Sequence, residues 1–164
     1  MDLEVGNLSE VINEVSAVMA EKLRQDGFTL HLDTKGLKPF PYDREALIQI
    51  LINLVENSVK FGAKGNRKEI TIRARSEKNK TLLSVSDTGP GLESKELSRI
   101  FDDFYRSEKA VKDNTKGTGI GLALVRRMVE AMGGSVKASN NQDKDKGPGL
   151  TVTMTLGAPI DEAE

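Results

Sequence analysis

The feature that most constrains the fold is the stretch from Leu47 to Gly62, which reads LIQILINLVENSVKFG. Placed on an α-helix at about 100° per residue, it separates into two faces. One face is almost entirely apolar, as a helix packed on a sheet requires, and contains Leu47, Ile50, Leu51, Leu54 and Ser58. The other face, here called the polar stripe, contains Gln49, Asn53, Glu56, Asn57 and Lys60. Asparagine is a mediocre helix former, so two of them inside a strong helix indicate that a ligand binds their amides.

Asp43 is expected to cap the start of this helix. The rest of the chain predicts two more long helices and a set of strands. A first helix is expected from a cap at Asn7 or Ser9 to Asp26-Gly27, with apolar residues at helical spacing: Leu8, Val11, Ile12, Val15, Val18, Met19 and Leu23. Strands are expected at 28–33, 69–75, 81–87, 135–139 and 150–156, with a turn or short edge strand around Pro39 and Pro41. A polar turn at 77–80 joins the second and third of these strands into a hairpin, and a polar hairpin loop at 140–149 joins the last two. A short helix is expected at 94–101 and a longer one at 120–132, ending at Gly133-Gly134.

This order of elements predicts an α/β (α+β) two-layer sandwich, in which a mixed, mostly antiparallel sheet of about five strands carries three main helices on one face. The 164 residues form one domain, and 37% hydrophobic residues suffice for a single core. No cysteine occurs, which excludes disulfides, thiolate metal sites and a cysteine nucleophile. A net charge of −1 gives no basic stripe for nucleic acid.

No apolar run approaches the roughly 20 residues of a membrane span, so we expect no direct membrane contact from this chain. Residues Met1 to Glu4 have neither the basic start nor the apolar core of a signal peptide. We therefore expect a cytoplasmic location, although a piece cut from a membrane-anchored parent would have the same composition.

The polar stripe suits a nucleotide site. An asparagine carbonyl oxygen can complete the octahedral shell of a Mg²⁺ ion that is otherwise held by phosphates and water. Lys60 lies one turn further on than Asn57 and adds a positive charge suited to a phosphate oxygen. Taken alone, the polar stripe is equally typical of an ordinary solvent-exposed helix face.

The second stretch is Asp87-Thr88-Gly89-Pro90-Gly91, which follows an expected strand. It places a carboxylate at the end of the sheet, beside glycine backbone that a flat ligand can approach closely. A carboxylate only accepts hydrogen bonds, so it can bind an exocyclic amine such as that of adenine. The same residues also fit an ordinary strand-to-turn junction with an Asx cap.

Two further stretches flank a charged segment, 106–116, that we expect to be a mobile loop. Residues 117–122, GTGIGL, open a helix, where free backbone amides and the helix dipole form an anion site. Their glycine spacing is neither that of a dinucleotide-binding fingerprint nor that of a Walker A loop. Glycine-rich loops are common, so this stretch alone is weak evidence for such a site. Residues 101–106, FDDFYR, contain two phenylalanines that can anchor the base of the loop in the core. Arg106 could then reach a terminal phosphate, or could be a surface arginine beside core aromatics.

In this order the four stretches resemble the conserved boxes of the catalytic ATP-binding domain of sensor histidine kinases of two-component systems. This domain (HATPase_c) has the Bergerat, or GHKL, fold that it shares with gyrase B, mismatch-repair ATPases and a heat-shock chaperone. NLVENSVKF is similar to the N box, DTGPGL to the G1 box, IFDDFYR to the F box and GTGIGLAL to the G2 box. The resemblance covers nearly the whole chain and implies that ATP and Mg²⁺ are bound.

The resemblance also implies a role for individual residues. Asn57 corresponds to the Mg²⁺ ligand, Lys60 and Arg106 to phosphate contacts, Phe61 to the residue against the adenine ring, and Asp87 to the carboxylate that reads adenine. On the adenine side, the family's backbone near the ligand corresponds to Gly89 and Gly91. On the phosphate side, beneath the loop expected at 106–116, it corresponds to Gly117, Thr118, Gly119, Gly121 and Leu122. Asp103 departs from the pattern, since many relatives carry Arg, Gln or Pro there.

Asn53 favours a kinase over a hydrolase. In the hydrolytic relatives a glutamate stands at this position and activates water as a general base, whereas an amide has no sufficiently basic lone pair. Glu56 is a weaker replacement, because it lies about 100° round the helix from Asn57. The resemblance implies that the nucleophile is a histidine on a separate helical dimerisation and phosphoacceptor domain.

The only histidine, His31, lies between leucines in an expected strand and lacks the acidic neighbour and downstream proline of the family's acceptor segment. We therefore expect residues 1–164 to be one catalytic domain of a larger kinase, without its dimerisation domain and with a response regulator as an indirect partner. The alternatives are a Bergerat-fold ATPase, an anti-sigma-type protein-serine kinase and, from another class, a nucleotide-sensing docking module without catalysis.

Overall fold

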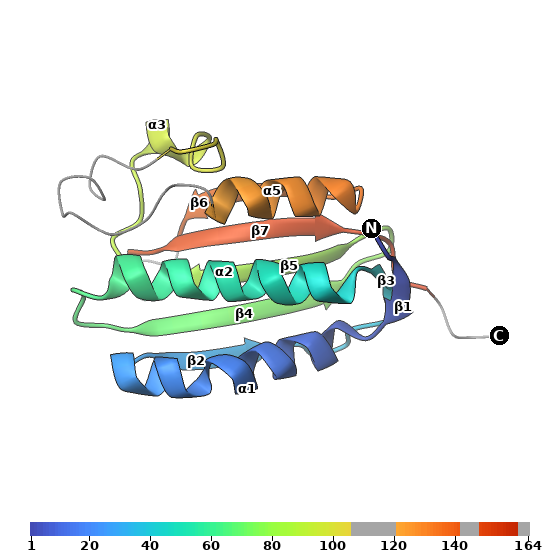
Figure 1. Cartoon of the computed structure of the whole chain (residues 1–164), viewed down its shortest axis with the longest axis horizontal. Helices are drawn as coiled ribbons and strands as arrows, with labels where there is room; N and C mark the ends of the chain where they lie inside the picture. The colour runs from blue at the N-terminus through green and yellow to red at the C-terminus, as the bar shows by residue number, and fades with distance from the viewer. Residues whose placement is uncertain (106–120, 142–147, 161–164) are drawn as a thin grey trace.

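The computed structural model describes residues 1–105, 121–141 and 148–160. Its centre is a five-stranded sheet in the order β2 (Thr29–Asp33), β4 (Glu69–Ser76), β5 (Thr81–Asp87), β7 (Leu150–Leu156) and β6 (Ser135–Asn140). Only β2 and β4 are parallel, and the other neighbours are antiparallel. Helices α1 (Leu8–Asp26), α2 (Arg44–Gly62) and α5 (Gly121–Ala131) lie side by side on one face, with α2 in the middle (Figure 1). This arrangement confirms the predicted sandwich.

Local capping explains where the long helices begin and end. Asp43 caps α2 by accepting a hydrogen bond from the Ala46 amide at 3.0 Å. Asn7 caps α1, and Gly27 ends it in the left-handed conformation at φ 77°. Gly133 has φ 81° just after α5. The sequence therefore predicted these helices and their ends correctly within a residue or two.

Several elements differ from the prediction. β1 (Glu4–Gly6) pairs antiparallel with β3 (Phe40–Tyr42) in a separate two-stranded sheet, and β1 was not predicted because three residues are too few for a visible alternation. The short helix α3 (Ser94–Leu97) ends earlier than expected. Val18 was assigned to the packed face of α1 but is 60% exposed. Its spacing fits the apolar face, but it lies at the solvent edge of that face.

The core lies between the helix layer and the inner face of the sheet. All five residues assigned to the packed face of α2 are buried, and they pack with inward-facing strand residues that include Ile70, Ile72, Leu83, Val85 and Met154. The opposite face of the sheet carries mainly polar side chains, as a solvated antiparallel sheet can. The packing places the last turns of α2 beside the end of β5. Every helix in the described ranges is too short or too polar to span a bilayer.

Candidate functional site

The site is built around Asp87, the last residue of β5, which is only 9% exposed. Its Oδ1 atom accepts hydrogen bonds from the Gly89 amide at 3.0 Å and the Leu150 amide at 3.1 Å. Its Oδ2 atom accepts one from the Ser58 hydroxyl of α2 at 3.1 Å. Oδ1 is thereby saturated, and Oδ2 keeps a lone pair that a ligand can use.

The carboxylate of Asp87 is held without a cation. Burial raises its pKa, and the three hydrogen bonds from Leu150, Gly89 and Ser58 lower it in part. In the described part of the chain, no lysine or arginine forms an ion pair with it. A buried carboxylate with hydrogen bonds but no counter-ion is costly, so its presence favours a binding role over a structural one.

Two glycines allow the backbone after Asp87 to pack closely on its surroundings. A Cβ atom on Gly89 would lie 3.3 Å from Asp87 Oδ1 and 3.7 Å from the Cα of Gly62 in α2. Gly91 has φ 73°, and a Cβ there would lie 2.8 Å from Asn140 Oδ1. The Phe61 side chain, at the same end of α2, is 42% exposed and can contact a ligand.

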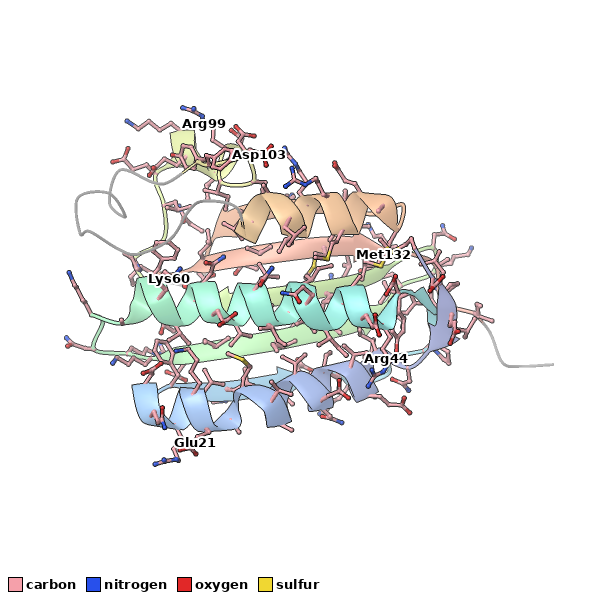
Figure 2. All side chains as sticks on the ribbon, viewed as in Figure 1. Glu21, Arg44, Lys60, Arg99, Asp103 and Met132 are labelled. Atoms are coloured by element: carbon pink, nitrogen blue, oxygen red, sulfur yellow. The ribbon has the colours of Figure 1, made fainter. Side chains whose placement is uncertain are left out.

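The polar stripe follows α2 along its exposed side. Asn57 and Lys60 share one face of the helix, because residues three apart are neighbours, and Lys60 lies on the last turn (Figure 2). Asn57 is half-buried, and its amide makes no hydrogen bond within the described residues. Asn53 Oδ1 accepts a hydrogen bond from Gln49 Nε2 at 3.2 Å, and Glu56 is exposed.

The segment after α3 only partly matches its prediction. Phe101 is buried at 4% exposure, as expected, but Phe104 is 71% exposed with a left-handed φ of 61° and does not anchor the loop in the core. Tyr105 donates a hydrogen bond to the buried Glu96 at 2.7 Å, and Arg99 lies over its ring at 5.1 Å.

Asp103, the departure from the family pattern, is labelled in Figure 2. It forms an ion pair with Arg127 of α5 at 2.9 Å. Its neighbour Asp102 pairs with Arg126 at 3.6 Å. Two ion pairs therefore join the turn at 101–105 to α5. Asp103 has a structural partner on α5 and is not a free negative charge beside the ligand.

Several predicted site residues lie outside the described residues: Arg106, Gly117, Thr118 and Gly119, together with the loop expected at 106–116. The other two phosphate-side residues, Gly121 and Leu122, are the first residues of α5 and are partly buried. The structure thus brings together the residues that were expected on the adenine side, Asp87, Gly89, Gly91 and Phe61, at the end of α2 that also carries Asn57 and Lys60.

Sequence reasoning missed three residues that pack on Asp87 or on the segment that follows it, because it assigned 140–149 to a polar hairpin loop. Asn140 Oδ1 accepts from the Leu92 amide at 2.9 Å, and its Nδ2 donates to the Leu92 carbonyl at 2.6 Å. Asn141 Nδ2 donates to the Asp87 carbonyl at 2.8 Å. A Cβ on Gly149 would lie 2.0 Å from that same carbonyl oxygen. Two consecutive asparagines at a strand end were the available signal.

Residues 42–160 match the family of histidine kinase-, DNA gyrase B- and HSP90-like ATPases. The chain belongs to this family. It is 36% identical over 114 residues to the sensor histidine kinase WalK of Bacillus subtilis, which covers 70% of this chain and 18% of WalK. It is 32% identical over 169 residues to the aerobic respiration control sensor ArcB of Escherichia coli, covering 97% of this chain and 20% of ArcB. The ATPase domain thus spans about a fifth of these relatives.

Solved structures of the family agree with the fold. The catalytic domain of histidine kinase ThkA superposes with a TM-score of 0.80 at 27% identity, covering 96% of this chain and 98% of that domain. Full-length ShkA in complex with AMPPNP gives a TM-score of 0.79 at 27% identity, covering 96% of this chain and 32% of ShkA. The architecture is therefore that of histidine kinase catalytic domains.

Proposed function

We propose that this domain binds Mg-ATP and donates the γ-phosphoryl group to a histidine on a separate helical phosphoacceptor domain. The observation that carries the proposal is the buried Asp87 carboxylate, fixed by three hydrogen bonds at the C-terminal end of α2 and with a free lone pair on Oδ2. An ionised carboxylate is a pure acceptor, so it matches the 6-amino group of adenine and repels the 6-oxo group of guanine.

Phe61 and the glycine backbone are proposed to contact the adenine ring. Phe61 is exposed beside the segment that Gly89 and Gly91 allow to pack closely, and an aromatic face suits stacking on a flat base. The family relative ShkA is described in complex with AMPPNP, which supports the proposal that this chain binds a nucleotide.

Asn57 is proposed as the one protein ligand of Mg²⁺. The described residues contain no group of three or more Asp, Glu, His or Cys side chains that could bind a metal, so a cation here would take most ligands from phosphate and water, as Mg²⁺ often does. The half-buried amide of Asn57 fits this role. Bound Mg²⁺ would offset the phosphate charge.

Lys60 and Arg106 are proposed to contact the phosphates and offset their charge. Gly117, Thr118, Gly119, Gly121 and Leu122 are proposed to line the phosphate side, with backbone amides as donors. Phosphoryl transfer needs mainly positioning and charge compensation, so a domain without its own nucleophile can supply most of the catalytic groups.

Asn53 supports transfer over hydrolysis. It stands where hydrolytic relatives carry the general base, and its Oδ1 already accepts a hydrogen bond from Gln49. An amide oxygen at this place can orient water but cannot remove its proton. A Bergerat-fold ATPase or a protein-serine kinase would be distinguished by the rate at which the isolated domain releases phosphate from ATP.

The acceptor histidine is proposed to belong to another domain. His31 of β2 is exposed and hydrogen-bonded through Nε2 to Glu69 at 3.0 Å, on an edge strand. The sensor histidine kinase WalK and the sensor protein ArcB are roughly four to five times as long as this chain, and ThkA is described in complex with a response regulator protein. We therefore propose that residues 1–164 are the catalytic domain of such a kinase, working in the cytoplasm with a response regulator as indirect partner.

Calorimetry with ATP and Mg²⁺ tests the binding step. We expect heat of binding for the native domain and its loss in Asn57→Ala and Asp87→Ala, each shown to be folded by its thermal transition. Unchanged binding in both variants would favour a docking module that uses other residues. Labelled ATP should transfer label to a histidine of an added helical acceptor domain and leave this domain unlabelled; stable self-labelling would contradict the proposal.

A further inference from the structure

Asp87 is held from two sides, and on one of them Ser58 of α2 donates to its carboxylate. On the other side lies the base of the β6–β7 hairpin, where Asn141 donates to the Asp87 carbonyl oxygen. We propose that Asn141 is a positioning residue for adenine selectivity, because it keeps the Asp87 carboxylate oriented with Oδ2 available to the ligand. This inference rests on the proposed function, since it assigns the means by which the same site discriminates between bases.

The hydrogen bonds at the end of the sheet explain how Asn141 acts. The β5–β7 ladder runs in antiparallel register as far as Ser86 opposite Thr151. One residue further, the Leu150 amide donates to the side chain of Asp87 and not to its main chain. The Asp87 carbonyl would then lack this donor, and the Asn141 amide supplies the replacement at 2.8 Å. A backbone donor is thus released to fix the carboxylate.

The direction of the Asn141 amide is itself fixed. The Thr151 hydroxyl donates to Asn141 Oδ1, which leaves Asn141 Nδ2 to face the Asp87 carbonyl. Because that donation uses the only hydroxyl proton of Thr151, Ser86 must be the donor in the 2.8 Å contact between the two hydroxyl groups. A chain of hydrogen bonds therefore runs from Ser86 through Thr151 and Asn141 to Asp87.

Neighbouring contacts restrict the 87–92 segment, which begins at Asp87, at its other end. Asn140 pairs with both backbone groups of Leu92, five residues after Asp87. Gly149 packs directly on the Asp87 carbonyl, where no Cβ would fit. Two adjacent side chains at the end of β6 thus hold both ends of the 87–92 segment. Without Asn141, the Asp87 carbonyl would compete for the Leu150 amide, and Oδ1 would lose one of its two donors.

The test compares ATP with purine riboside triphosphate, which lacks only the 6-amino group. Dissociation constants are measured by calorimetry with Mg²⁺ for the native chain, Asn141→Ala and Asn141→Asp. The aspartate keeps the acceptor for Thr151 but loses the donor to Asp87. Thr151→Val leaves Asn141 in place and removes the hydroxyl that orients it. Asn79→Ala, in the exposed turn between β4 and β5 at the far end of β5, is the matched control.

We expect the native domain and the control to prefer ATP, and the preference to fall about 3- to 10-fold in Asn141→Ala and Asn141→Asp, as the loss of one hydrogen bond implies. Thr151→Val should show a smaller fall in the same ratio. Equal weakening of both nucleotides, or no change in either, would overturn the positioning role. If the native domain itself shows no preference, the proposed adenine contact of Asp87 is wrong, which is a different failure.

Discussion

Replacing Asp87 with asparagine separates the acceptor role of the carboxylate from its shape. The side-chain oxygen of Asp87→Asn must remain where Oδ1 is, because the Gly89 and Leu150 amides both donate to that position. The new NH₂ group then occupies the place of Oδ2, where Ser58 can accept from it. The ligand would therefore meet a donor in place of an acceptor, with almost no change in volume.

The size of the effect follows from the bond that is lost. A hydrogen bond to a charged group contributes about 1.5–3 kcal/mol, so ATP should bind roughly 10- to 150-fold more weakly to Asp87→Asn. GTP should bind more tightly than it does to the native domain, because its 6-oxo group can accept a hydrogen bond from the new amide. The preference for ATP over GTP should therefore narrow or reverse. Calorimetry with both nucleotides and Mg²⁺ measures the two dissociation constants.

The same variant should be more stable than the native domain at neutral pH. Burial raises the pKa of Asp87, so its contribution to stability is present at low pH and is lost as the pH rises through that pKa. Asparagine carries no charge to bury, and its advantage in the free energy of unfolding should appear only above the pKa. Asp33→Asn, which changes an exposed carboxylate paired with Arg73 on the outer face, is the matched control. For the binding prediction, an ATP affinity of Asp87→Asn within twofold of that of the native domain would refute the reasoning from the lost hydrogen bond.

Three further substitutions test other parts of the site. Gly149→Ala should destabilise the domain by about 1–3 kcal/mol in chemical denaturation, since its Cβ would overlap the Asp87 carbonyl; an unchanged midpoint would show that the hairpin base is looser than the structure indicates. A double-mutant cycle of Asp103→Ala and Arg127→Ala should give a coupling below about 1 kcal/mol that disappears in 1 M salt, because the pair is half-exposed; coupling that survives salt would contradict this. Asn53→Glu should raise phosphate release from ATP by at least about tenfold if a general base is what the site lacks, and no increase would count against that explanation.

The sequence predicted what depends on local periodicity and capping. The two faces of α2 follow from helical spacing alone, and Asp43, Asn7 and Gly27 mark helix ends through their own side chains or backbone. The β4–β5 hairpin was equally visible, because two alternating segments flank one polar turn. The pairing of β1 with β3 was not visible, since two three-residue strands 34 residues apart, from Gly6 to Phe40, leave no periodic signal.

The surroundings of Asp87 show why a site is harder to predict than an element. Its four donors are Ser58 from α2, Gly89 from the following turn, Leu150 from β7 and Asn141 from the end of β6, and they meet only when β7 pairs between β5 and β6. The motif residue could be identified from its own neighbours in sequence. The residues that orient it could not, because the order of strands in the sheet decides which strand end lies beside β5. A carboxylate that is fixed by three separate elements is also sensitive to each of them, so the proposed adenine contact depends on the whole sheet being formed.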